Sequence, residues 1–220
     1  MGQKLENNPF VYVFKKSPEY EIRQSIRLVR KHYPNHPVWV IGDKPKEVII
    51  DKYIKHSQKH RLRSTRITMM IVDICHLTDQ FILIYDDIFL SERFDIRKHY
   101  HKGELYNKVR NPTGYNKCLL NTQEFLNYNN KPCLNYECHQ PQYFNSKKLL
   151  NLLDMLDWVN YEHVLKSIYN NWYELGGEEI INLKVKGDHL KRAKKYWDEY
   201  GAFSSAEDMP PNLKNWLKTL

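Results

Sequence analysis

The most constraining feature of the sequence is a pair of short apolar runs separated by one helix-length segment. Residues 10–14 and 38–41 are rich in β-branched and aromatic side chains, which is typical of buried strands. Between them, apolar residues recur at helical spacing from Glu19 to Tyr33. A strand, a helix and a second strand in quick succession predict an α/β fold with a sheet flanked by helices.

A third apolar run, residues 81–90, carries two adjacent acids. Asp86 and Asp87 stand at the predicted carboxyl end of a buried strand, and apolar residues resume at Ile88. Charged side chains are rarely buried without a partner, and ligands of open α/β sheets bind at this edge. The pair therefore indicates a cation or a polar substrate. The alternative is a plain turn in which Asp86 caps the next segment and Asp87 faces water.

The remaining segments have weaker patterns. The expected elements are a short strand at 48–50, a helix that runs to about Leu77 and is capped by Ser64 or Thr65, and an irregular insertion over the sheet edge at 91–134. They continue with a helix from Ser146 to about Trp158, capped by Asn145 or Ser146, and a strand candidate at 180–185. We expect residues 1–160 to form the sheet domain. Residues 161–220 are expected to be a mainly helical C-terminal extension packed on the same domain.

Composition narrows the choice of partners. The chain has 34 Lys and Arg against 26 Asp and Glu, a formal charge of +8. Such a charge attracts polyanions, or it serves solubility alone.

The four cysteines show no CxxC pairing and follow no secretory leader, so we expect reduced thiols and a cytoplasmic location, in a host cell if the source is a virus. No apolar run approaches the ~20 residues of a membrane-spanning helix.

An acid pair at a strand end in a basic protein suits a nucleotide diphosphate. A divalent cation can bridge carboxylates to the diphosphate and offset the charge that grows as a sugar–phosphate bond breaks. Mg²⁺ or Mn²⁺ fits such oxygen ligands. Basic side chains at the strand ends would neutralise the remaining charge. The candidates are Lys15, Lys16, Arg61, Arg63 and Arg66.

Four segments, in order, resemble the Stealth-type and phage-encoded sugar transferases. Residues 21–27, EIRQSIR, match an E-L-R-x-S-L-R helix, and residues 41–45, IGDKP, match a strand that ends near D-x-x-P. Residues 86–90, DDIFL, match a strand that ends in D-D-x-F, and residues 137–141 resemble a Glu/His-x-Pro element. The resemblance covers residues 10–150, with residues 203–205 as a further similar segment.

The resemblance implies a GT-A-like Rossmann-type sheet and a donor that is a nucleotide diphosphate sugar, with a UDP-sugar favoured. It implies that Asp86 and Asp87 hold Mn²⁺ or Mg²⁺ and that His139 acts at the reaction centre. Tyr85 stands at the first position of the usual D-x-D, so Asp87 is expected to bind the metal, with Asp86 assisting through water. The predicted donor-binding residues are Lys15, Arg23, Arg27, Asp43, Arg63 and Arg66.

Several of these residues have a second interpretation. Glu137 is either a general base or an ion-pair partner of Lys147. His139 is otherwise a hydrogen-bonded loop histidine. His189 is either a third metal ligand or an exposed residue at a helix start. Arg23 and Arg27 share a helix face, which solvation alone would explain.

We predict a metal-dependent glycosyltransferase that acts on an acceptor hydroxyl, in hydroxymethylated pyrimidine of phage DNA or in a surface glycan. One alternative transfers a sugar-phosphate, as the capsular Stealth proteins do. Another is a non-catalytic basic nucleic-acid-binding protein, favoured by the basic and aromatic residues at 99–110. Against that alternative, Asp86 and Asp87 would repel phosphates.

Overall fold

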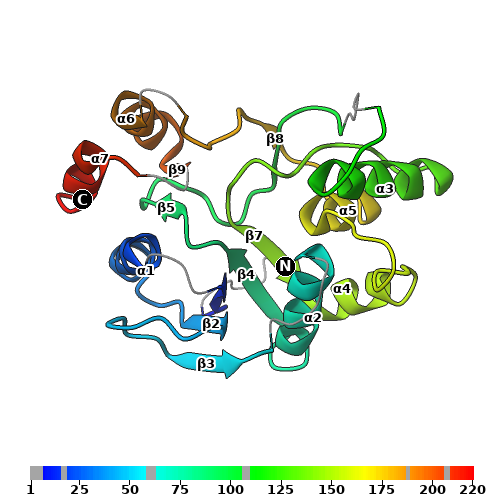
Figure 1. Ribbon diagram of the computed structural model, residues 1–220, viewed down its shortest axis with the longest axis horizontal. Helices are drawn as coiled ribbons and strands as arrows, with labels where there is room; N and C mark the ends of the chain where they lie inside the picture. The colour runs from blue at the N-terminus through cyan, green and yellow to red at the C-terminus, as the bar shows by residue number, and fades with distance from the viewer. Residues whose placement is uncertain (1–6, 16–18, 58–62, 106–109, 187–188, 206–208) are drawn as a thin grey trace, which may run out of the picture.

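The computed structural model describes residues 7–15, 19–57, 63–105, 110–186, 189–205 and 209–220. Its centre is a five-stranded sheet in the order β3-β2-β1-β4-β7 (Figure 1). The parallel strands are β3 (Lys52–Lys55), β2 (Val38–Gly42), β1 (Phe10–Phe14) and β4 (Gln80–Ile84), and β7 (Gln142–Asn145) pairs antiparallel with β4. The predicted α/β fold, a mainly parallel sheet flanked by helices, is confirmed.

Helix α1 (Tyr20–His32) covers one face of the sheet, as its apolar spacing predicts. Ile22, Ile26 and Val29 are buried in a cluster that includes residues of β1, β2 and β4. Each large apolar side chain buried in this way contributes roughly 1.5–3 kcal/mol. The connection from β1 through α1 to β2 brings the carboxyl ends of these two strands to the same edge as the end of β4.

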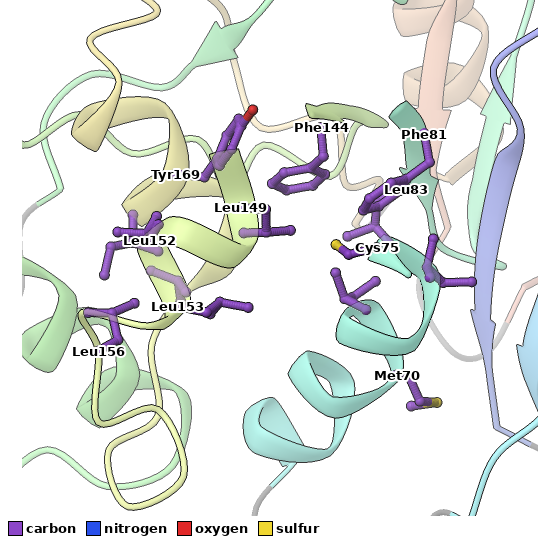
Figure 2. Close-up of a cluster of buried hydrophobic side chains, with 14 of the residues drawn as sticks. Met70, Cys75, Phe81, Leu83, Phe144, Leu149, Leu152, Leu153, Leu156 and Tyr169 are labelled. Atoms are coloured by element: carbon purple, nitrogen blue, oxygen red, sulfur yellow. The ribbon is translucent and has the colours of Figure 1, made fainter. Parts of the chain in front are cut away.

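The opposite face is covered by α2 (Arg63–Cys75), α4 (Ser146–Leu153) and α5 (Leu165–Trp172). Figure 2 shows side chains from α2, β4, β7 and α4 meeting in one cluster, with Tyr169 of α5 beside them. Phe81 and Phe144 pair across β4 and β7, with ring centroids 5.4 Å apart. This cluster fixes the antiparallel edge strand against the parallel part of the sheet.

The C-terminal residues return to the first half of the chain. Strand β5 (Ile88–Leu90) pairs antiparallel with β9 (Ala202–Ser204), which follows α6 (His189–Tyr200) and precedes α7 (Pro211–Leu217). The Phe89 and Phe203 rings lie 4.9 Å apart in a third cluster shared with both helices. A short parallel pair joins β6 (Tyr100–His101) to β8 (Glu178–Glu179).

Two strand predictions are wrong. Residues 48–50 are not a strand, because Ile49 is exposed and the chain joins β2 only after Asp51, whose carboxylate accepts the Val38 N–H at 2.7 Å. The edge strand that follows, β3, consists of polar and half-exposed residues and so lacks the buried-strand pattern. Residues 180–185 contain no strand either, only an isolated bridge between Lys184 and Ser204.

The helix predictions need correction as well. Residues 91–134 are not wholly irregular, since they contain α3 (Tyr115–Tyr128). Its buried face includes Asn121 and Thr122, which bond to the backbone of residues 162 and 118, and these polar residues obscure the apolar period. Helix α2 already includes Ser64, and α4 ends at Leu153. The predicted cap of α4 is confirmed, because the Asn145 side chain accepts the Lys148 N–H.

The four cysteines are unpaired, as predicted. Within the described ranges, no helix is both long enough and apolar enough to cross a bilayer.

Candidate active site

The acid pair occupies a tight turn at the carboxyl edge of the sheet. β4 ends at Ile84, and the Ile88 N–H donates to the Tyr85 carbonyl at 3.2 Å, which closes the turn before β5. The Asp87 side chain is 22% exposed and accepts the Ser204 hydroxyl at 2.8 Å, with the Lys184 Nζ at 3.7 Å. Asp87 therefore does not face open water, which rules out the plain-turn alternative for this residue.

Glu21 is a third carboxylate at this place, and it is not among the site residues predicted from the sequence. It lies in the first turn of α1 and accepts the Ser205 hydroxyl at 2.5 Å. Burial raises the pKa of Glu21 to about 7; the Ser205 hydrogen bond opposes the rise, and the charges of Asp87 and Asp86 add to it. Its position at the start of the EIRQSIR segment, one residue before buried Ile22, was the available signal.

Glu21, Asp86 and Asp87 make up what we call the acidic half of the site. Burial is the largest cause of the raised pKa of Glu21, and the like charges of Asp87 and Asp86 add to it, so a bound cation would stabilise the ionised form of this carboxyl. Oxygen-rich donor sets of this kind fit Mg²⁺ or Mn²⁺. No group of three or more His, Cys, Asp or Glu side chains with the geometry of a preformed metal cluster occurs among the described residues. The metal set of Asp86, Asp87 and His189 accordingly stays a prediction.

His139 faces the acidic half from the loop at residues 137–140, which we call the histidine loop. Its backbone is left-handed, with φ of 55°, and its Nδ1 lies 2.8 Å from Asn182 Oδ1. That oxygen also accepts the Lys184 N–H at 3.1 Å, so the amide oxygen faces the ring and Nδ1 carries the proton. Nε2 is then left with a free lone pair, which is the form that accepts a proton.

Electrostatics keep His139 in this neutral form. Burial lowers the pKa of His139 to about 4, and Lys166 and Lys184 lower it further, while Asn182 and Asp87 oppose the shift. A neutral imidazole near neutral pH can take a proton from a hydroxyl group. Asn182 and Lys184 are exposed or half-exposed residues without a local motif, so their positions beside His139 could not be predicted from the sequence.

Glu137, the other candidate base, is engaged differently. Its Oε1 accepts bonds from the Ser167 N–H at 3.2 Å and the Ser167 hydroxyl at 3.3 Å. The Lys102 ammonium donates to its backbone carbonyl at 2.9 Å. Lys147 is exposed at the start of α4, and the described partner of the carboxylate is Ser167 instead. These hydrogen bonds tie Glu137 to the first turn of α5, and its role as a general base stays a prediction.

The predicted donor-binding residues divide into two groups. Asp43 follows β2 beside Lys15 at the end of β1, where the Asp43 N–H donates to the Phe14 carbonyl at 2.9 Å. Arg63 begins α2, and its charge lowers the pKa of Tyr85, against the larger opposing effect of burial. Arg66, one turn later, has a buried Nε with no hydrogen-bond partner among the described atoms. These residues stand at or near the same edge as the acid pair.

Two predicted donor-binding residues of α1 bond to neighbouring segments of the protein. Arg23 pairs with Glu47 at 2.5 Å, and Arg27 donates to the Leu217 carbonyl at 2.6 Å, which ties α1 to α7. His189 begins α6, and its Nδ1 is buried without a partner among the described atoms. Tyr100 of the 99–110 stretch is buried in β6 against Phe94. Lys16, Arg61, Tyr106 and Lys108 lie outside the described residues.

No family model and no curated protein matches the chain. One solved structure with a similar arrangement is a glycosyltransferase involved in the glycosylation of the major capsid of PBCV-1, with 9% identity and a TM-score of 0.44 over 97% of this chain and 100% of that one. Another is the apo form of the glycosyltransferase GlyE in Streptococcus pneumoniae TIGR4, with 10% identity and a TM-score of 0.43. That match covers 97% of this chain and 59% of the GlyE chain. At this level, similarity does not identify an activity, and the Stealth-type resemblance stays a prediction.

Proposed function

We propose that the chain is a metal-dependent glycosyltransferase that moves a sugar from a nucleotide diphosphate sugar to an acceptor hydroxyl. The observation that carries the proposal is the meeting of two unlike groups at the carboxyl edge of the sheet. Asp86 and Asp87 are half-buried carboxylates in one turn, and Asp87 lies within electrostatic reach of a neutral histidine, His139. Ligands of open α/β sheets bind at this edge.

The acidic half would hold the cation. Asp87 and Asp86 are the proposed ligands, and Glu21 is close enough for their charges to raise its pKa. When bound, Mn²⁺ or Mg²⁺ would supply positive charge to the diphosphate leaving group. Arg63 and Arg66 are the proposed contacts for the remaining phosphate charge, since the buried Nε of Arg66 has no hydrogen-bond partner among the described residues.

His139 would act on the acceptor. Its Nδ1 proton is donated to Asn182, so Nε2 is the atom that takes the proton from the acceptor hydroxyl. The acceptor oxygen then attacks the anomeric carbon of the sugar while the bond from that carbon to the diphosphate breaks. Glu137, held by Ser167, is assigned to loop structure and not to proton transfer.

A thermal-shift screen tests the proposal. Wild type, Asp87→Asn and the control Asp154→Asn, an exposed aspartate after α4, are compared with UDP-sugars in the presence and absence of Mn²⁺. A ligand at 100 times its Kd stabilises by about 2.7 kcal/mol. For a chain of this size, that corresponds to roughly 5–10 °C in Tm.

We expect at least one UDP-sugar to shift wild type and Asp154→Asn in a Mn²⁺-dependent way, and Asp87→Asn not to respond. Equal stabilisation of all three proteins would contradict the assignment of Asp87.

With an active donor, a labelled β-phosphate distinguishes sugar transfer from sugar-phosphate transfer. Label that stays on released UDP supports sugar transfer, whereas label in the acceptor indicates sugar-phosphate transfer.

A further inference from the structure

The lysine at position 166 is the least expected residue near the site. Lys166 lies in the first turn of α5 and is only 3% exposed. A cation in such a place loses most of its hydration, which costs several kcal/mol unless nearby groups offset the loss. Burial accordingly lowers the pKa of Lys166, and the carboxylate charges of Glu137 and Asp87 oppose that shift.

The Lys166 ammonium touches both sides of the candidate site. It donates a hydrogen bond of 2.7 Å to the carbonyl of Gln140, the residue after His139. It also lies 5.5 Å from the centroid of the Tyr85 ring, the residue immediately before Asp86. A cation over an aromatic ring is attracted to the ring face, and the attraction is stronger away from water. One side chain therefore contacts the histidine loop and the acid turn at once.

The rest of α5 holds the same loop along its length. Asn171 exchanges hydrogen bonds with the backbone N–H and carbonyl of Leu134, at 2.8 and 2.7 Å. Ser167 accepts the Tyr136 N–H at 3.0 Å and donates to Glu137. These contacts fix the segment that leads into the histidine loop. Among the described contacts of α5 with this segment, Lys166 is the one that also reaches the acid turn.

We propose that Lys166 is a positioning residue that sets the distance and orientation of His139 relative to Asp86 and Asp87. It does so by bonding the loop carbonyl at Gln140 while packing over Tyr85. The catalytic part of this inference rests on the proposed function. The structural part, that Lys166 controls the surroundings of His139, does not.

The charge of Lys166 gives a readout that a purely structural residue would lack. The groups facing His139 are Lys166 from α5, Asp87 from the acid turn, and Asn182 and Lys184 from the segment after β8. Removing one of the two cations in this set should let the pKa of His139 rise. Loosening of the loop alone would change the line shape of the His139 ring resonance without raising the pKa of His139.

The experiment compares Lys166→Met, Lys166→Gln and the control Lys147→Met, which removes an exposed lysine at the start of α4. The ring resonances of His139 are assigned with His139→Gln and followed by NMR from pH 3 to about 8, bracketing the shifted and ordinary histidine values. Lys166→Met should make His139 titrate at higher pH than in wild type. Lys147→Met should leave the titration unchanged.

The second measurement is the rate of sugar transfer. With the UDP-sugar and Mn²⁺ that stabilise the wild type, Lys166→Met should lower kcat about 10-fold to 100-fold, because small displacements of a reacting group cost this much. The KM for the donor should stay within about threefold. Lys166→Gln, whose amide still donates to Gln140, should retain more turnover than Lys166→Met.

A folded Lys166→Met whose His139 resonances and titration match wild type overturns the proposal. If Lys166→Met does not fold, Lys166→Gln decides by the same measurement, since it also removes the charge. If the wild type transfers no sugar from any donor, the proposed function fails, and the NMR arm still decides the role of Lys166.

Discussion

The two sides of the candidate site are built in opposite ways. The acidic half is held by neutral hydroxyl groups, Ser204 to Asp87 and Ser205 to Glu21, from a strand near the C-terminus. The histidine loop is held from α5 by Ser167 and by the buried ammonium of Lys166. The hydroxyls orient the carboxylates, and one ammonium group, that of Lys184, lies 3.7 Å from Asp87. Burial is the largest cause of the lowered pKa of His139, and the ammonium groups of Lys166 and Lys184 lower it further. The acidic half therefore offers carboxylate oxygens to a cation, and the histidine loop offers a neutral imidazole to a proton.

The largest expected effect separates the two bases of the histidine loop. His139→Gln should lower turnover about 10²-fold to 10⁴-fold, the usual contribution of a general base. Glu137→Gln keeps an oxygen to accept the Ser167 bonds and should lower turnover by less than about 10-fold. The measurement is kcat with a UDP-sugar and Mn²⁺, with circular dichroism as the control for folding. The reverse order of the two variants would transfer the role of base to Glu137.

The next effect concerns the strand that supports the acidic half. Phe203 is fully buried and stacks on Phe89 and Trp216. Phe203→Ala should lower the free energy of unfolding by about 3–5 kcal/mol, measured by urea denaturation. In native conditions, the Mn²⁺-dependent donor shift should weaken while the His139 resonances change little. Equal disturbance of both would show that the two sides are not supported independently.

A smaller effect isolates one hydrogen bond of the acidic half. Ser204→Ala removes the donor to Asp87, and loss of a bond to a charged group should cost about 1–2 kcal/mol of stability. Lys184 remains near Asp87, which limits the loss. Thermal unfolding without metal measures the cost. Ser167→Ala, which removes the matching hydroxyl on the other side, serves as the comparison.

The last effect is a pH dependence from Glu21. Its folded pKa of about 7 lies above the ordinary value of 4.5, so the folded state holds the proton more tightly than the unfolded state. Stability from this group is fully present below the ordinary value and is lost as pH rises through about 7. Glu21→Gln should therefore raise Tm relative to wild type at pH 8 and not at pH 4. A Tm difference that does not change with pH would refute the raised pKa of Glu21.

Part of this site could be predicted from local patterns in the sequence. Strands β1, β2 and β4 are buried on both faces, and each is a continuous apolar run in the sequence. An acid pair shortly after such a run is therefore easy to recognise as a candidate site. His139 was found through its segment, which resembles a known element. Strand β3 and helix α3 were missed because polar residues occupy the positions on which pattern recognition depends, at a sheet edge in one case and on a buried face in the other.

The amino-acid sequence by itself determined the parallel core and the exit of an acid pair from it, because hydrophobic periodicity is a local property of the chain. Only the tertiary structure decided what surrounds that pair. Glu21, Lys166 and Ser204 come from segments far apart in the sequence, and each looks like an ordinary helix or strand residue there. Their electrostatic roles arise from distances of a few ångströms across the fold, and no local pattern encodes such distances.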